Sequence, residues 1–302
     1  MAFMKRIFFF LLLNIAVMTA ISVVLAVVTS LGYMPSGYYS ASLVMCLLWG
    51  MVGAFISLGM SRWAAKRFMG VQLIGPNSGG EAGQLVEKVY QLSRKAGIQV
   101  MPEVGIYESP EVNAFATGPT KNRSLVAVST GLLHRLNDNE VEGVLGHEVA
   151  HIANGDMVTM ALLQGVVNAF VMFFARIVAH LVSQQVREES RHIVYFATTI
   201  VFQILFMILG HFVIAAFSRW REFRADRGGA RLAGRDKMIG ALEALRRTIG
   251  PMEDMQRSIL EANQHQHASI ASLKISSGAA ASWFSTHPPI EKRIMALSRG
   301  SD

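Results

Sequence analysis

The chain has 302 residues and a mean hydropathy of +0.36, and 52% of its residues are hydrophobic whereas only 16% are charged. This composition excludes an ordinary soluble globular protein and places part of the chain in lipid. The formal net charge of +7 comes from basic residues that are scattered or flank apolar runs, as in proteins that meet anionic head groups, so we expect no nucleic-acid partner. The single cysteine, Cys46, excludes an intramolecular disulfide.

Two apolar runs predict an N-terminal transmembrane hairpin. Residues 7–28 carry no charged side chain, and residues 38–60 form a second run; each is long enough to cross a bilayer. A cleavable signal peptide is the alternative for the first run, but a signal core has only about 7 to 15 residues, which favours a retained anchor. Basic residues bracket the hairpin: Lys5, Arg6, Arg62, Lys66 and Arg67. Because positive residues stay on the cytoplasmic side, the N-terminus and the chain beyond the hairpin are expected there.

After the hairpin the composition becomes that of a soluble domain. Residues 81–96 predict an amphipathic helix that ends at Gly97, and β-branched and aromatic residues predict strands at 104–107, 112–117 and 125–128. We therefore expect a small sheet. An exposed edge strand of this sheet could hold an extended peptide by main-chain pairing, although edge strands also occur for purely structural reasons.

The next predicted helix carries a candidate metal site. Asn137 and Glu140 have the spacing of a capping box, which starts a helix. Because His147 and His151 are four residues apart, both rings point from one face and can bind one zinc ion, and Glu148 lies beside them as a candidate base. A zinc ion that binds water, with a carboxylate beside it that takes the proton of this water, is the arrangement that hydrolyses amides. The pattern also arises by chance, so this interpretation depends on the rest of the chain.

A second transmembrane hairpin is predicted at residues 157–182 and 193–217. Both runs are apolar and long enough to span, but they contain more polar residues than the first pair: Gln164, Asn168, Arg176, His180, Gln203 and His211. Two interpretations stay open. The polar residues either snorkel or bridge helices, or they line a cavity through which a membrane-embedded substrate reaches the zinc.

The segment after this hairpin contains Glu222 and Asp226, one helical turn apart. Glu222 is a candidate third zinc ligand, and Asp226 could accept the other ring N–H of a ligating histidine. The alternative is that both carboxylates only pair with neighbouring arginines. A third histidine six residues after His151 is absent, because Met157 stands there, so a distant carboxylate is favoured.

The C-terminal part predicts helices around a polar insert. His265 and His267 lie in a Gln- and Ser-rich stretch and are expected to be solvated rather than to bind metal. The sequence THPP at 286–289 predicts the start of a terminal helix. His287 either flanks that helix start or faces the active site.

These motifs together resemble those of the HtpX membrane zinc metalloproteases, relatives of the CAAX prenyl endopeptidases, over essentially the whole chain. The resemblance rests on four motifs in order: NAFATG at 113–118, GHEVAH at 146–151, REFRAD at 221–226, and THPP at 286–289 followed by Arg293. It implies one zinc ion per chain, bound by His147, His151 and Glu222, with Glu148 as general base and Asp226 supporting a ligand. It further implies that Asn113 lies on the substrate-binding edge and that His287 contacts substrate or the oxyanion.

The expected fold is a mostly α membrane protein with four transmembrane helices and a cytoplasmic α+β zincin-like catalytic domain with a small sheet. We divide it into a hairpin (1–67), a first catalytic half (68–156), a second hairpin (157–217) and a second catalytic half (218–302). The expected function is cleavage of misfolded or damaged membrane proteins at the bacterial inner membrane. The alternatives are a channel or transporter, or a non-catalytic chaperone-like binder, with a structural zinc. A homo-oligomer is left open.

Overall fold

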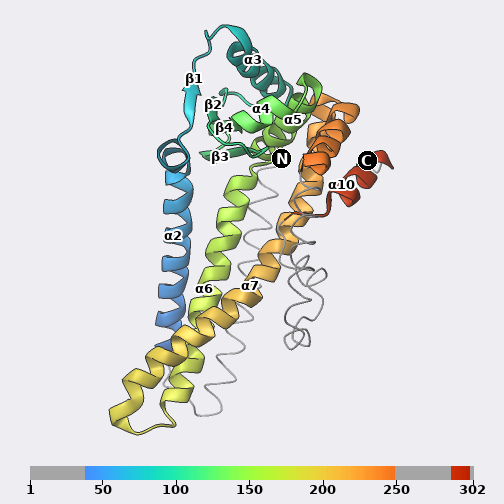
Figure 1. Cartoon of the computed structure of the whole chain (residues 1–302). Helices are drawn as coiled ribbons and strands as arrows, with labels where there is room; N and C mark the ends of the chain where they lie inside the picture. Colours follow the sequence, from blue (N-terminus) through green and yellow to red (C-terminus); the bar gives the residue numbers. More distant parts are fainter. Residues whose placement is uncertain (1–37, 249–286, 300–302) are drawn as a thin grey trace, which may run out of the picture. The chain divides into compact units, whose positions relative to one another are not determined.

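The computed structural model describes residues 38–248 and 287–299 (Figure 1). Its elements are α2 (Tyr38–Phe68), β1 (Gln72–Ile74), α3 (Gly80–Lys95), β2 (Glu103–Tyr107), β3 (Ala114–Thr120), β4 (Arg123–Ser129), α4 (Thr130–Arg135), α5 (Asp138–Asn154), α6 (Asp156–Ser183), α7 (Glu188–Ala233) and α10 (Ile290–Ser298). Residues 235–248 are also helical. The expected class, mostly helical with a small sheet, is confirmed. The first predicted span (7–28), His265 and His267 lie outside the described residues.

The four strands form one mixed sheet in the order β1-β2-β4-β3. β2 runs parallel to β4, whereas β1 and β3 pair antiparallel with their neighbours. β4 is buried from Ser124 to Ser129 because it lies inside the sheet, and β3 forms one edge, against which α5 packs. The three predicted strands are present. The sequence missed β1, which has only 3 residues and is largely exposed.

Local sequence signals fix the ends of the helices around this sheet. α3 buries Leu85, Val89 and Leu92, as its apolar spacing predicts, and Gly97 follows it with φ 70°, a left-handed conformation that suits glycine. The predicted capping box of α5 is present. Asn137 Oδ1 accepts from the backbone N–H of Glu140 at 3.1 Å, and Glu140 Oε2 accepts from the N–H of Asn137 at 2.9 Å. The metal-motif helix therefore begins at a fixed point.

Within the described residues, three helices are long and apolar enough to cross a membrane: Ser42–Phe68, Asp156–Ser183 and Glu188–Ala233, with mean hydropathies of 2.1, 1.9 and 2.4. Large apolar side chains such as Trp49, Ile193 and Phe196 are exposed on these helices. Water would be an unfavourable solvent for such a surface, and lipid a favourable one. The later predicted spans lie within α6 and α7. α7 is longer than the predicted span and continues without a break through Glu222 and Asp226.

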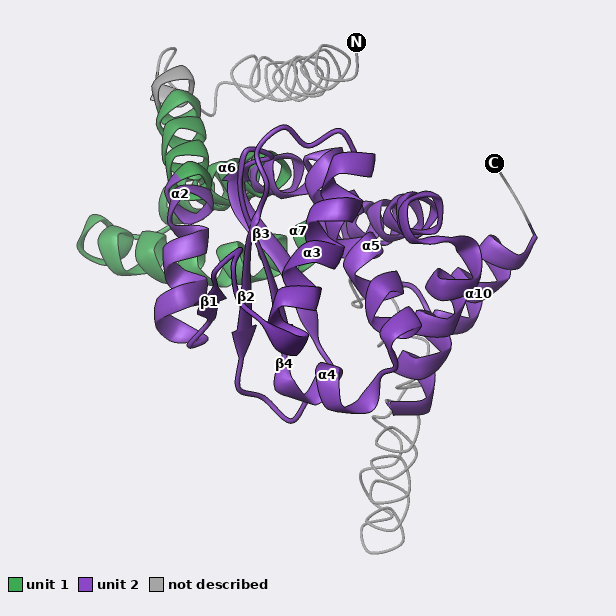
Figure 2. Cartoon of the chain, turned by 90° about the horizontal axis from the view of Figure 1, so that it is seen from above, with its two compact units in different colours: residues 1–55, 162–211 green, residues 56–161, 212–302 purple. Residues whose placement is uncertain are grey.

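The chain forms two compact units, shown in different colours in Figure 2. Unit 1 comprises Met1–Phe55 and Leu162–His211, and unit 2 comprises Ile56–Ala161 and Phe212–Asp302. In unit 1, Arg176 Nη1 donates to the buried Cys46 Sγ at 2.6 Å. Asn168 and Gln203 help to line a cavity of about 360 Å³ in the same unit. Arg176 thus makes a contact inside this unit, whereas Asn168 and Gln203 line its cavity.

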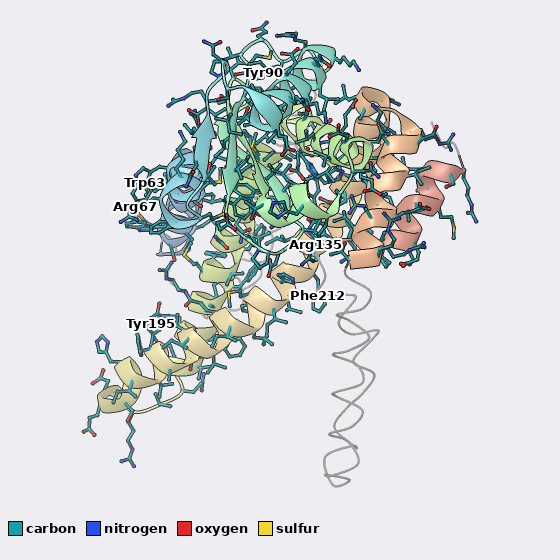
Figure 3. The ribbon with its side chains drawn as sticks, turned by 45° about the horizontal axis from the view of Figure 1, so that its top comes forward. Trp63, Arg67, Tyr90, Arg135, Tyr195 and Phe212 are labelled. Carbon is teal, nitrogen blue, oxygen red and sulfur yellow. The ribbon has the colours of Figure 1, made fainter. Side chains whose placement is uncertain are left out.

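In unit 2, the end of α2 is tied to the sheet. Arg62 and Lys66 form ion pairs with Glu103 of β2 at 2.5 and 2.8 Å. Trp63 and Arg67 also project from these last turns (Figure 3). Aromatic and basic residues gather in this way where a helix passes from lipid to water.

Candidate metal centre

Three side chains of α5 and α7 meet in one small buried space. The Nε2 atoms of His147 and His151 lie 3.1 Å apart. Each carboxylate oxygen of Glu222 faces one of these rings, with Oε2 3.4 Å from His147 Nε2 and Oε1 3.4 Å from His151 Nε2. A tetrahedron with centre-to-corner bonds of about 2.0 to 2.1 Å has edges of roughly 3.3 to 3.4 Å. The three residues therefore form a triangle whose contacts are close to this spacing, and one donor atom from each residue lies within 4.8 Å of the other two.

Close packing of α5 against α7 brings Glu222 to the histidines. A Cβ added at Gly146 would lie 2.9 Å from Ala233 Cβ, and one added at Gly229 would lie 3.0 Å from the backbone nitrogen of His147. A larger residue at either position would push the helices apart. Gly146, directly before the first histidine, thus helps to set the distance between His147 and Glu222.

The other ring nitrogen of each histidine contacts a buried aspartate. His147 Nδ1 lies 3.0 Å from Asp226 Oδ1, and His151 Nδ1 lies 2.7 Å from Asp156 Oδ2. If each Nδ1–H donates to its aspartate, each Nε2 lone pair is left facing the centre of the triangle. The contact of Asp226 agrees with the sequence-based hypothesis. Asp156 was missed, because Asn-Gly-Asp after the motif reads only as a helix break. Gly155, with φ 67°, makes the turn that places Asp156 beside the ring of His151.

The surrounding carboxylates favour positive charge at this centre. Burial disfavours the charged form of His147, but hydrogen bonds with Asp226 and Glu222 outweigh burial and raise its pKa to about 9. The carboxylates that attract a proton here would equally attract a metal cation. Glu222 is only 1% exposed, and burying a carboxylate is costly unless it is paired or binds a metal. Its position opposite two imidazole nitrogens fits a ligand set for a divalent metal.

The remaining candidate residues, Glu148, His287 and Asn113, differ in their contacts with this centre. Glu148 follows His147 on α5 and is partly exposed. The exposed His287 has Nδ1 3.0 Å from Glu222 Oε2. Asn113 is exposed just before the edge strand β3, where its backbone pairs with Ser129. His287 thus contacts Glu222, whereas no hydrogen bond between described residues joins Asn113 to the three donors.

Two arginines of the centre were also missed by sequence reasoning. Arg293 of α10 contacts Asp226, and Arg224 of α7 contacts Asp156. An arginine four positions into a terminal helix carries no local sign of such a contact. Only its place after THPP in the motif order pointed to Arg293.

Comparison with known proteins identifies the family. The model of peptidase family M48 matches residues 80–300, a range that includes all three metal-site donors. The chain belongs to peptidase family M48. This M48 peptidase is 55% identical over 304 residues to the "Protease HtpX homolog" of Bacillus licheniformis, covering 97% of this chain and 98% of the relative. It is 52% identical to the homolog of Bacillus subtilis, with the same coverage. It is also 47% identical over 303 residues to the "Protease HtpX" of Thioalkalivibrio sulfidiphilus, again with that coverage.

The fold also resembles a solved structure. The crystal structure of S. mikatae Ste24p aligns with a TM-score of 0.56 and 16% sequence identity, covering 94% of this chain and 64% of that chain. At this identity the likeness concerns the fold alone. Family membership, together with the apolar helices, makes this M48 peptidase a membrane metalloprotease that acts on polypeptides. Membership of a peptidase family disfavours the two alternative functions, a channel or transporter and a non-catalytic binder.

Proposed function

We propose that this M48 peptidase is a zinc-dependent endopeptidase that cleaves misfolded or damaged membrane proteins on the cytoplasmic side of the bacterial inner membrane. The observation that carries the proposal is the buried cluster of His147, His151 and Glu222, in which the two Nε2 atoms lie 3.1 Å apart and each lies 3.4 Å from one oxygen of Glu222. Two imidazole nitrogens and one carboxylate oxygen form the donor set of a catalytic zinc site, which leaves one position open.

The three donors would hold zinc, and the aspartates would hold the donors. Their chemistry fits zinc better than calcium or magnesium, which prefer ligand sets of oxygen alone. When bound, zinc supplies a Lewis acid that polarises the scissile carbonyl and lowers the pKa of water. Asp226 and Asp156 keep the histidines in the tautomer whose Nε2 is an acceptor.

Glu148 is the proposed general base. It lies between the two histidines in sequence and is partly exposed, so water can reach its carboxylate. The Glu148 carboxylate also interacts electrostatically with Arg293 of the centre. Burial disfavours the charged form of Arg293, but Asp226 outweighs burial and holds the pKa of Arg293 above its usual value, and the negative charge of Glu148 adds to this effect. Glu148 takes a proton from the attacking water and passes it to the leaving amine.

The sheet edge and the C-terminal helix supply the proposed substrate contacts. β3 is an edge strand packed against α5, so an extended peptide can pair with it while its scissile bond lies near Glu148. This mode binds backbone and demands little of the sequence, which suits damaged proteins as substrates. We assign Asn113 to this edge. We assign His287, which already reaches Glu222, to substrate or oxyanion contact.

The proposed topology has four spans with the catalytic domain in the cytoplasm. It adds residues 7–28 to the three apolar helices and rests on the basic residues before the first span and after the second. The division into residues 1–67, 68–156, 157–217 and 218–302 is part of this proposal, and a homo-oligomer is compatible with it.

Zinc content and proteolysis of the wild type and of Glu148→Gln, both purified in detergent, test this function. The wild type is expected to hold one zinc ion and cleave a casein-like unfolded substrate. Glu148→Gln is expected to hold zinc but not to cleave, because the amide cannot accept the proton. Full activity of Glu148→Gln, or its loss of zinc, would refute the role of Glu148. Absence of zinc from the active wild type would refute the metal assignment.

A further inference from the structure

Each histidine of the metal centre contacts an aspartate, and each of these aspartates in turn contacts an arginine. Arg293 Nε and Nη2 donate to Asp226 Oδ2 and Oδ1 at 2.8 and 2.6 Å, and Asp226 Oδ1 lies 3.0 Å from His147 Nδ1. A second series of contacts links an arginine to His151. Arg224 Nη2 donates to Asp156 Oδ1, and Asp156 Oδ2 lies 2.7 Å from His151 Nδ1.

Both aspartates are buried, so they need the arginines. Asp226 and Asp156 are each 1% exposed, and Arg293 is 7% exposed. A carboxylate removed from water without a partner takes up a proton or turns toward solvent. In either case it stops accepting the Nδ1–H of its histidine in a fixed direction. The two-pronged contact of Arg293 holds both oxygens of Asp226 and therefore fixes the plane of the carboxylate.

Arginine cannot itself bind a metal cation, and at close range its charge repels one. Arg293 Nη2 lies 3.7 Å from Glu222 Oε2 and 3.5 Å from His147 Nδ1, so this repulsion is not negligible. Orientation of the ligands and repulsion of the metal thus predict opposite effects of removing Arg293. Because Arg293, Asp226 and His147 are all buried, we expect the loss of ligand orientation to outweigh the relief of repulsion.

We propose that Arg293 and Arg224 are positioning residues of the metal centre, each holding the aspartate that fixes one histidine ligand. The inference rests on the proposed zinc function. It makes the C-terminal helix α10, which carries Arg293, a part of the metal centre. Loss of that helix loosens His147 even though α10 donates no ligand.

The test measures metal binding by the full-length chain in detergent. Zinc affinity is determined by competition with a chromogenic chelator, and the visible spectrum of the cobalt-substituted protein reports the ligand geometry. Arg293→Met is expected to weaken zinc binding by about 10- to 100-fold and to shift the cobalt spectrum. Arg293→Lys keeps the charge but loses the fork, and is expected to fall between Arg293→Met and the wild type. Arg224→Met is expected to weaken zinc binding in the same direction but by less, because Arg224 makes a single contact with Asp156 and is partly exposed.

Arg247→Met is the matched control, because Arg247 is 63% exposed and pairs with Glu140, away from the donors. It is expected to leave zinc affinity and the cobalt spectrum unchanged. Far-UV circular dichroism of each chelated variant establishes that it folds. Should Arg293→Met fail to fold, Arg293→Lys and Arg224→Met carry the test.

A double variant separates positioning from simple attachment of α10. If Arg293 acts through Asp226, then adding Arg293→Met to Asp226→Asn causes little further loss of zinc affinity. An equal loss in both backgrounds would overturn the inference, as would wild-type or tighter zinc binding by Arg293→Met. These outcomes leave the proposed function intact when the wild type binds zinc and cleaves substrate. Failure of the wild type itself to bind zinc refutes the proposed function instead.

Discussion

The exposed ring of His287 reaches the buried carboxylate of Glu222, with Nδ1 3.0 Å from Oε2. His287 precedes α10 and Glu222 lies on α7, so the contact joins two segments far apart in sequence. It places an imidazole beside the proposed third ligand without making it one of the three donors.

His287→Ala is therefore expected to lower kcat/KM for an unfolded substrate by roughly 10- to 100-fold through loss of an oxyanion or substrate contact. Zinc content is expected to stay at the wild-type level, because all three donors remain. Elemental analysis and proteolysis on the same preparation check this. Glu291→Ala, an exposed change in the first turn of α10, is the control. Zinc lost in parallel with activity would mean that His287 supports Glu222 instead.

His147→Ala is expected to lose the metal itself. Two donors remain, and removing one of three protein ligands lowers affinity by orders of magnitude. Zinc that binds only the folded state stabilises it, so a chelator should lower the thermal transition of the wild type but hardly that of His147→Ala. Thermal unfolding with and without chelator measures the difference. An equal chelator effect in both proteins would place the metal elsewhere.

Glu103 should make stability depend on pH. Its burial opposes ionisation, but Lys66 and Arg62 outweigh burial and hold its pKa below the usual value. A carboxylate with a lowered pKa in the folded state contributes stability above its unfolded pKa of about 4.3, and loses it as pH falls through the folded value. Since Glu103 is one-third exposed, we expect Glu103→Gln to cost only about 0.5 to 1 kcal/mol at neutral pH.

Thermal unfolding of both proteins across acidic and neutral pH tests this. The difference between wild type and Glu103→Gln is expected to disappear once Glu103 is protonated. A difference that persists unchanged to strongly acidic pH would show that the two ion pairs are not its source.

Gly146→Ala should separate α5 from α7. The new methyl would lie 2.9 Å from Ala233 Cβ and 3.2 Å from the carbonyl oxygen of Gly229, so the helices must move. We expect a loss of about 1 to 3 kcal/mol of stability together with weaker zinc binding, because Glu222 moves away with α7. Gly59→Ala, where nothing lies within 4 Å of the new methyl, is the control. Unchanged zinc affinity in Gly146→Ala would contradict the link between packing and ligand distance.

The interpretation of α5 from sequence succeeded because its signals are local. The capping box acts over three residues, and the i, i+4 spacing of His147 and His151 alone puts both rings on one face of a helix. Three of the four expected spans were equally readable, since length and apolar composition alone predict the long apolar helices among the described residues. β1 was not, because three largely exposed residues carry no pattern and depend on pairing with β2.

The amino-acid pattern was enough to indicate a membrane-inserted chain with two histidines and a glutamate on one helix, and it left Glu222 open between ligand and ion-pair partner. The folded structure was needed to show that Glu222 lies 3.4 Å from both imidazoles and that Asp156, Arg224 and Arg293 surround them. The reason is physical. Periodicity fixes which residues share a face of one helix, whereas the approach of α5, α7 and α10 depends on packing between side chains that are distant in the chain.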